Sequence, residues 1–353
     1  MGLLLRLVIL WLALPGRLPA QVGPPPVIVS LALQNGFCVL AFAAATGQVY
    51  TVQATADLAS PVWTNPVGSV VGVGSVMEFV DAGVTAPSRF YRVAVGAGGP
   101  APVYSLNVVG YVNRLMQTGT NLVANPLDAW DNTITNVLWN CPDGTVIYDS
   151  FGGSSECYGG VWAPASLSLN PGDGVILVNP SGPFLVTFAG EVMQGALTNP
   201  LPAQPMLKSS MAPVAGLWEF PAQEGDQIQT WDVTNQTFVM HTFSDGAWTN
   251  TPPTVQPGEA FWVNVSAATN WVQNFTVFGG GPPIFSAPQL SGGKSNITFQ
   301  LSGPAGSDYV LQVSTNLLNW SPVNTSTIPV SGSINLTNPI TGTSRRFYRV
   351  YLQ

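Results

Sequence analysis

Charged residues are scarce in this chain. Asp, Glu, Lys and Arg make up 8% of its 353 residues, against roughly 25% in an average soluble protein. Without Arg6 and Arg17, which lie near the N-terminus, 8 basic residues remain against 17 acidic ones. This balance argues against nucleic-acid binding, which needs a cationic face to displace the counterions of the phosphates.

Groups suited to catalysis are also few. His241 is the only histidine, and no G-x-S-x-G or comparable nucleophile motif accompanies it. Its neighbours, TFVMHTF, predict a strand from which the imidazole points outward. The three cysteines form no C-x-x-C pair, which argues against zinc. We therefore expect no enzymatic activity, no catalytic residue and no cofactor.

Long apolar runs are missing after the first residues. Residues 1–20, MGLLLRLVILWLALPGRLPA, place one early cation before an apolar stretch and a small residue, the order found in a secretory signal peptide. The stretch is shorter than the roughly 20 residues that span a bilayer. We expect a secreted protein, or one at the outer cell surface, with no transmembrane segment after cleavage. A retained short membrane anchor is the alternative.

What the chain does contain is typical of strands and turns. Thr, Asn, Ser, Gly, Pro and aromatic residues are abundant, as in extracellular β proteins. Clusters of Gly and Pro at 22–26, 96–102 and 279–283 predict linkers. The expected fold is all-β, with a terminal module at 27–95, a central domain at 103–278 and a second terminal module at 284–353.

The two terminal units are copies of one module. The phrase RFYRV stands at 89–93 and again at 346–350, and Trp63 and Trp320 each precede its first arginine by 26 residues. A register kept over such a distance indicates a repeat.

Alternation with period two predicts which side chains of the phrase are buried. Tyr91 and Val93 fall on the core face. Arg92 and Arg349 fall on the outer face, where a planar guanidinium stacks on a neighbouring aromatic ring. An arginine site for an anionic ligand is the alternative.

The Tyr-x-Val-x-Val strand and the single tryptophan resemble fibronectin type III and immunoglobulin-like β-sandwiches, although the module is shorter than the about 100 residues of that fold. Residues 36–95 and 296–353 are more similar to a C-terminal module of large secreted and cell-surface proteins of environmental Gram-negative bacteria, with the pattern YTVQAS…NWT…RFYRV. The resemblance implies a β-sandwich accessory unit, sometimes linked with sorting or display at the cell surface, and implies no enzymatic activity. The central region resembles a domain of the same proteins.

The central domain contains a weaker duplication. Trp162 and Trp248 keep an offset of 86 residues, and so do Asp173 and Glu259. Two halves, at about 103–190 and 191–278, are expected to pack around a pseudo-twofold axis, because so small a half leaves its apolar face exposed. Each is expected to contain a short helix followed by strands, with Asp131 as the first helix cap.

Two cysteines of the central domain align with aromatic residues of the sister half. Cys141 aligns with Phe220, and Cys157 aligns with Phe243. Both sites are therefore expected to be buried, and export favours oxidation of neighbouring thiols. A Cys141–Cys157 disulfide and two separate buried thiols remain alternatives, with Cys38 as a small core residue.

The central domain holds 13 acids against only Arg114 and Lys208. Asp173 and Glu259 could face each other like the two acids of a glycoside hydrolase. The simpler interpretation is that each ends a Pro-Gly turn before a strand. Calcium is a further alternative, since carbonyl-rich loops hold acids that suit it. These acids are Asp128, Asp131, Asp143 and Asp226.

Eight tryptophans lie in the central domain, and exposed indoles can stack on sugar rings. Those matched between the halves, Trp139 with Trp218 and Trp162 with Trp248, are expected to be core anchors. The unmatched Trp130, Trp231 and Trp271 are the candidates for glycan stacking.

The function expected from the sequence is that of a secreted structural or adhesive protein of the cell surface or extracellular matrix, without catalytic activity. Its partners would be polysaccharides or other surface proteins. The alternative is a carbohydrate-binding protein that uses the aromatic side chains of the central domain. An acid-dependent glycoside hydrolase ranks third.

Overall fold

The computed structural model describes residues 25–34, 36–66, 68–82, 85–96, 103–250, 253–277, 284–285, 289–290, 296–302, 308–315, 319–328, 333–339 and 346–352. The predicted signal peptide lies outside these ranges, as do most residues of the predicted linkers. The regular secondary structure of the described residues is antiparallel sheet apart from one short helix, so the all-β class is confirmed. No helix among the described residues is long and apolar enough to cross a membrane.

The N-terminal module is a sandwich of two sheets. The first sheet has the order β1 (Ile28–Gln34), β2 (Phe37–Ala43), β5 (Val76–Ala82). In the second, β3 (Val49–Thr55) lies between β4 (Val70–Val71) and β6 (Ser88–Val95). Tyr91 and Val93 of β6 have no exposed surface and lie in the core between the sheets, as the alternating pattern predicted.

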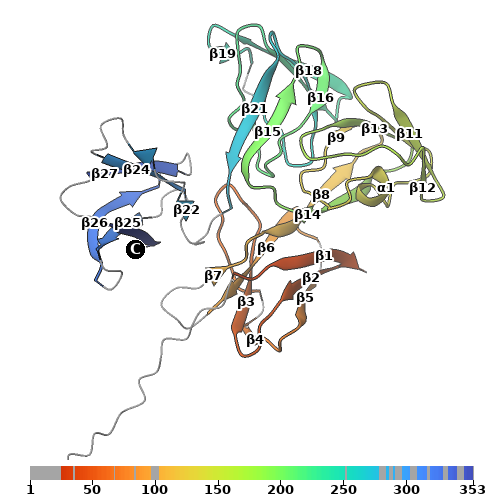
Figure 1. The fold of residues 1–353 in the computed structure, drawn as a ribbon. Coiled ribbons are helices and arrows are strands. Elements are labelled where there is room, and N and C mark those ends of the chain that lie inside the picture. Colours follow the sequence, from red (N-terminus) through yellow and green to blue (C-terminus); the bar gives the residue numbers. More distant parts are fainter. Residues whose placement is uncertain are drawn as a thin grey trace, which may run out of the picture.

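The second sheet continues into the central domain. Strand β6 pairs with β7 (Val103–Tyr104) and β8 (Val109–Met116), and β8 pairs with β14 (Phe184–Glu191). The resulting order is β14-β8-β6-β3-β4 (Figure 1). Val109 and Tyr111 of β8 are buried in the core of the N-terminal module. The module and the central domain thus share one sheet across the segment where the sequence predicted a linker.

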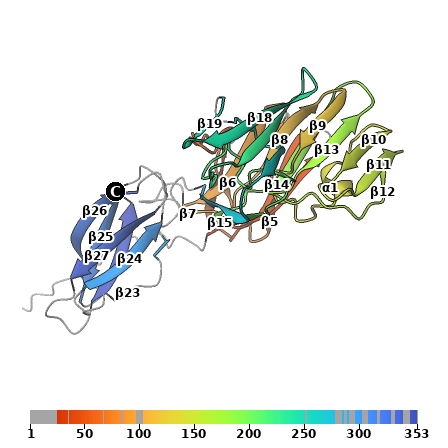
Figure 2. The same cartoon turned by 90° about the horizontal axis from the view of Figure 1, so that it is seen from above.

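The C-terminal module repeats this arrangement with two sheets of its own, visible beside the other two units in Figures 1 and 2. In one, β24 (Asn296–Ser302) lies between β27 (Ser333–Pro339) and the short strands β22 (Ile284–Phe285) and β23 (Gln289–Leu290). In the other, β25 (Asp308–Ser314) lies between β26 (Ser321–Thr327) and β28 (Phe347–Leu352). The repeated phrase therefore occupies corresponding strands, β6 and β28.

In the N-terminal module the second arginine of the phrase is held between two rings. The guanidinium carbon of Arg92 lies 4.2 Å from the ring centre of Trp63 and 3.8 Å from that of Tyr104. Its Nε donates a 2.8 Å hydrogen bond to Oε1 of Gln53. The predicted stacking on an aromatic ring is confirmed, but Arg92 is only 5% exposed, because the central domain covers the outer face of this sheet.

In the C-terminal module the matching arginine stacks on one ring among the described residues. The guanidinium carbon of Arg349 lies 4.3 Å from the ring centre of Trp320. Its Nε donates a 2.8 Å hydrogen bond to Oε1 of Gln312. Arg349 is exposed. The two terminal modules therefore differ in what covers this face.

Two sheets of the central domain have the same strand order. The first runs β12 (Val161–Ala163), β11 (Ser154–Tyr158), β10 (Thr145–Tyr148), β13 (Val175–Asn179), β9 (Gly119–Val123). The second runs β19 (Ala247–Trp248), β18 (Thr237–Ser244), β17 (Gln227–Asp232), β20 (Phe261–Asn264), β16 (Met206–Lys208). Strands β15 (Gly195–Leu201) and β21 (Thr269–Phe275) pair with each other as β8 and β14 do. This shared order is the one that a duplication predicts.

The two halves meet through reciprocal contacts. The amide of Ala124 donates to the carbonyl of Gly258, and the amide of Ser209, at the matching position, donates to the carbonyl of Gly172. A small apolar cluster that includes Ala260 lies between the halves. Gly174 lies beside it, where an added Cβ would be 2.5 Å from the Cβ of Ala260. Close approach of the halves therefore requires small residues at these positions.

The predicted helix is confirmed in the first half only, as α1 (Ile134–Val137). Its N-cap is Thr133 rather than Asp131, because the carboxylate of Asp131 accepts the amide of Thr133 and so ends the preceding turn. The second half has a turn at the corresponding place, where Glu219 adopts a positive φ of 56°.

The matched tryptophans are not all core anchors. Trp162 is 2% exposed, and its indole donates to the carbonyl of Leu138. Trp139, by contrast, is 59% exposed, so its expected core role is wrong. A tryptophan directly after the inward-facing Leu138 at the end of a one-turn helix points away from the core.

Candidate functional site

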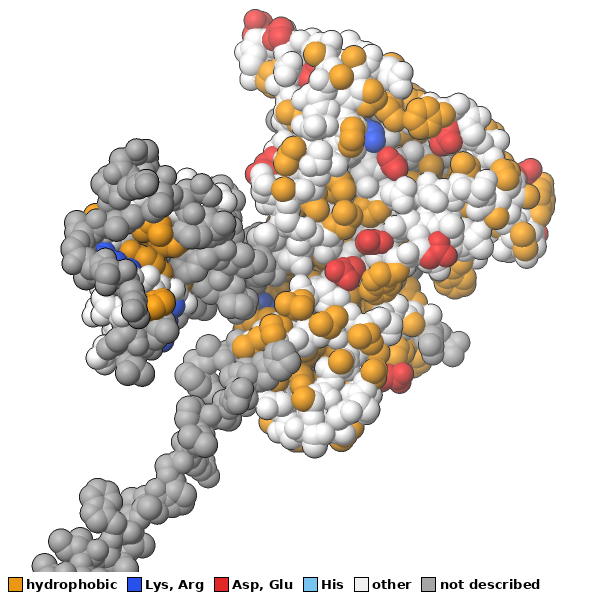
Figure 3. All heavy atoms as spheres, in the orientation of Figure 1, with side chains coloured by type: hydrophobic (Ala, Val, Ile, Leu, Met, Phe, Trp, Pro, Cys, Tyr) orange, Lys and Arg blue, Asp and Glu red, His pale blue; other side chains and the backbone are white. Residues whose placement is uncertain are grey.

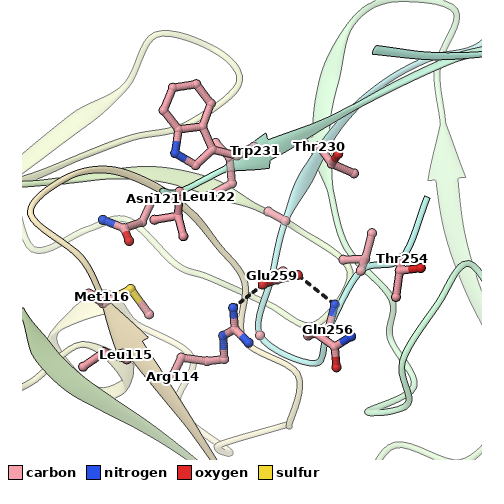
Figure 4. Close-up of a pocket in the computed structure, with 14 residues that line it drawn as sticks. Arg114, Leu115, Met116, Asn121, Leu122, Thr230, Trp231, Thr254, Gln256 and Glu259 are labelled. Carbon is pink, nitrogen blue, oxygen red and sulfur yellow. Dashed lines mark hydrogen bonds and ion pairs between the residues drawn. The ribbon is translucent and has the colours of Figure 1, made fainter. Parts of the chain in front are cut away.

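The candidate site is a cleft of about 280 Å³ between the halves of the central domain. Arg114 comes from β8, Leu122 from β9, Trp231 from β17, and Gln256 and Glu259 from the turn before β20. Figure 4 shows their side chains arranged around this cleft. Because the strands that carry them belong to both halves, neither half forms the cleft alone.

An ion pair forms the polar wall of the cleft. The guanidinium of Arg114 bonds one carboxylate oxygen of Glu259. The other oxygen accepts a hydrogen bond from the backbone N–H of Gln256 at 2.8 Å (Figure 4). The Nε of Arg114 is buried and has no hydrogen-bond partner among the described residues. A buried donor left without a partner costs about 1–3 kcal/mol, so an acceptor that entered the cleft would relieve that cost.

Trp231 supplies the apolar wall. Its indole nitrogen donates to the carbonyl of Thr120 at 2.8 Å, and its ring packs edge-on against Phe238, with the ring centres 4.6 Å apart. These two contacts fix the ring while part of it remains accessible. A fixed aromatic ring beside charged and amide groups is the usual composition of a sugar-binding surface.

The other two tryptophans predicted to stack on glycans do not join Trp231. Trp130 is 52% exposed in a loop and does not line the cleft. Trp271 has no exposed surface, and its indole donates to the carbonyl of Trp218. The proposed role of Trp271 at the surface is therefore corrected. On β21 it points inward, where the aromatic ring of Phe220 packs against it.

Asp173 and Glu259 do not form a carboxylate pair. Asp173 bonds the nearly buried Lys208, with 3.2 Å between Nζ and Oδ1, while Glu259 bonds Arg114. Each acid also follows its predicted Pro-Gly turn, because each amide donates to a carbonyl three residues earlier. On the face drawn in Figure 3 the acidic side chains lie scattered rather than gathered in a hollow.

The four acids considered for calcium serve separate turns. Oxygens of Asp128, Asp131 and Asp143 accept the amides of Trp130, Thr133 and Gly159 respectively. Asp226 accepts the amide and the hydroxyl of Ser266. Among the described residues, no three His, Cys, Asp or Glu side chains converge on one point. The structure therefore does not bring the proposed calcium ligands together.

Cys38, Cys141 and Cys157 are buried thiols in this structure. Cys141 and Cys157 belong to one core cluster, in which the sulfur of Cys157 lies 3.5 Å from the carbonyl oxygen of Cys141. Burial raises the pKa of Cys38 and of Cys141 to about 12. The expected burial of Cys141 and Cys157 is thus seen, and the two are neighbouring thiols rather than a disulfide in this structure.

His241 is buried rather than outward-facing, at 6% exposure. Its Nε2 lies 3.3 Å from the hydroxyl of Thr230 on the paired strand β17. A hydrogen-bond partner on the neighbouring strand lets the imidazole turn inward, which the alternating pattern of TFVMHTF did not reveal.

No family model and no curated protein matches this chain. Among solved structures, one match is described as the crystal structure of a tetra-tandem repeat in the extending region of a large adhesion protein. It is 9% identical, covers 93% of this chain and 98% of that one, and has a TM-score of 0.18. A TM-score this low does not establish that the two chains share a fold.

Proposed function

We propose that this chain is a secreted, non-catalytic structural or adhesive component of the cell surface or extracellular matrix. The observation that carries the proposal is the sheet shared by the N-terminal module and the central domain. A hydrogen-bonded ladder from β3 through β6 to β8 fixes the two units in one orientation, as a load-bearing or display role requires.

The ionisable side chains support the same proposal. The four acids considered for calcium accept backbone amides in turns, Asp173 and Glu259 pair with Lys208 and Arg114, and Asp81 of the N-terminal module bonds Arg89 at 2.9 Å. Side chains held in turns are poorly placed to transfer protons to a substrate, because catalytic acids and bases must converge on the reacting atoms.

Cell fractionation tests this function. We expect the native protein to remain with washed cells or matrix and to be released by protease treatment of intact cells. A monomer found only in culture medium, which also fails to bind fresh cells when added back, would contradict the proposal.

The cleft favours one second candidate, carbohydrate binding. Its support is the fixed ring of Trp231 beside the Arg114–Glu259 pair and the unpartnered Nε of Arg114. Together they offer a stacking platform and hydrogen-bonding groups to a neutral or acidic sugar.

A glycan array with the purified full chain tests this second candidate, followed by titration of any positive glycan. Trp231→Ala is expected to weaken binding about tenfold, the effect of removing an anchor worth about 1.4 kcal/mol. Trp130→Ala is the matched control, since Trp130 is exposed but does not line the cleft. Circular dichroism at the assay temperature checks that both variants are folded, because loss of the contacts of Trp231 with Thr120 and Phe238 is expected to lower the unfolding midpoint of Trp231→Ala. No binding on the array, or a loss only with Trp130→Ala, would refute binding in the cleft.

A further inference from the structure

The same pentapeptide forms two strands with different neighbours. Strand β6 lies inside a sheet, between β3 on one side and β7 and β8 on the other. Strand β28 pairs with β25, and on its other edge it pairs with no described strand. A strand edge with open amide and carbonyl groups can add a further strand.

The edge of β6 shows what such an added strand looks like. Phe90 lies opposite Gly110 and Tyr91 opposite Val109, while Ala94 lies opposite Tyr104. Glycine is required in the added strand, because a Cβ at Gly110 would lie 2.5 Å from Cδ1 of the Phe90 ring. The added segment thus has a defined pattern, Val-Tyr at 103–104 followed by Val-Gly-Tyr-Val at 109–112.

That segment also completes the module that it joins. Val109 and Tyr111 enter the hydrophobic core of the N-terminal module. The core described for the C-terminal module consists of residues of that module alone, and Tyr348 and Val350 of β28 are only partly buried against it. A strand beside β28 would bury further apolar surface at the corresponding place, which favours association.

The arginine of the phrase gives the edge its electrostatic character. Tyr104 covers the face of Arg92 that Trp63 leaves open, at 3.8 Å. The matching guanidinium of Arg349 stacks on Trp320 and is exposed. A guanidinium is complementary to the negative face of a second aromatic ring.

We propose that the edge of β28 opposite β25 binds an extended strand from a separate polypeptide. That strand has the pattern of residues 103–112, with an aromatic ring over Arg349 and a glycine opposite Phe347. The chain itself supplies the template, since the identical phrase in β6 already holds such a strand. The proposal goes beyond a general surface role, because it names the docking edge and the chemistry of its partner.

A synthetic peptide of residues 103–114, VYSLNVVGYVNR, is the probe. Fluorescence anisotropy with the labelled peptide and the purified full chain is expected to show saturable binding with one site per chain. Arg349→Ala is expected to weaken binding about tenfold, the effect of losing a partly desolvated cation–ring contact. A peptide with Gly110→Val is expected not to bind.

Arg92→Ala is the matched control, because it changes the same motif where the site is already filled. Hydrogen-exchange mass spectrometry on the unaltered chain locates the peptide without any substitution, and we expect protection at 347–352. Absence of binding would overturn the proposal, and so would protection confined to β6 or to another region. These measurements use purified protein, so their failure is distinguishable from failure of the cell-surface function.

Discussion

The two arginines of the repeated phrase allow one motif to be measured in two environments. Arg92→Ala removes a guanidinium held between two rings, together with its bond to Gln53. In a dry site the stacking is worth about 2 kcal/mol, and a charge-assisted hydrogen bond adds about 1.5 kcal/mol. Lost burial of the methylene stem adds about 2 kcal/mol.

One opposing contribution lowers this total. Burial lowers the pKa of Arg92 from 12.5 to about 10, so keeping its charge buried costs about 3 kcal/mol. Arg92→Ala removes this cost. The expected net destabilisation by Arg92→Ala is about 2.5 kcal/mol. Arg349 is exposed and stacks on one ring, so Arg349→Ala is expected to cost below about 1 kcal/mol.

Hydrogen exchange read peptide by peptide assigns each loss to its own module within the full chain. The amides of β3 and β6 report on Arg92→Ala, and those of β25 and β28 report on Arg349→Ala. Equal losses in the two modules, or no loss with Arg92→Ala, would refute the argument that the second ring and the covering domain set the difference.

Three further outcomes follow from burial and close contact. Trp162→Ala should destabilise the central domain by about 3–5 kcal/mol, whereas Trp139→Ala should change its stability by less than about 0.5 kcal/mol. Urea unfolding measures both losses, and similar values would contradict the difference in burial between the two side chains. Gly174→Val should destabilise the contact between the halves by about 1–3 kcal/mol, because its Cβ would lie 2.5 Å from the Cβ of Ala260. Faster hydrogen exchange in β9 and β16 would show this loss, and an unchanged exchange rate would contradict it. The three cysteines should resist iodoacetamide at pH 8.5 in the native protein, since a raised pKa keeps a thiol protonated until the pH approaches it. They should react fully in urea. Rapid labelling of the native protein would refute buried thiols, and so would an intact mass about 2 Da below that of the reduced chain, which indicates a disulfide.

Local patterns predicted much of this fold. Alternation placed Tyr91 and Val93 in the core and predicted that Arg92 and Arg349 stack on an aromatic ring, although only the structure identifies those rings as Trp63 and Trp320. These features depend on residues close in sequence or on an internal copy, so the chain itself carries the information.

Features set by distant segments were missed. Nothing near Arg114 indicates that it meets Glu259, because the pair joins strands from different halves. Trp271 appeared free for a surface role, yet its burial depends on Phe220, far away in the chain. The predicted linker at 96–102 was inferred from composition, which does not report that β6 and β8 pair across it.

Strand β8 contributes to three separate hydrophobic cores: Val109 and Tyr111 to that of the N-terminal module, Val112 to a second cluster and Met116 to that of the first central half. Fraying of this strand would open all three cores together. The N-terminal module and the central domain should therefore melt as a single cooperative unit in calorimetry, with the C-terminal module giving its own transition.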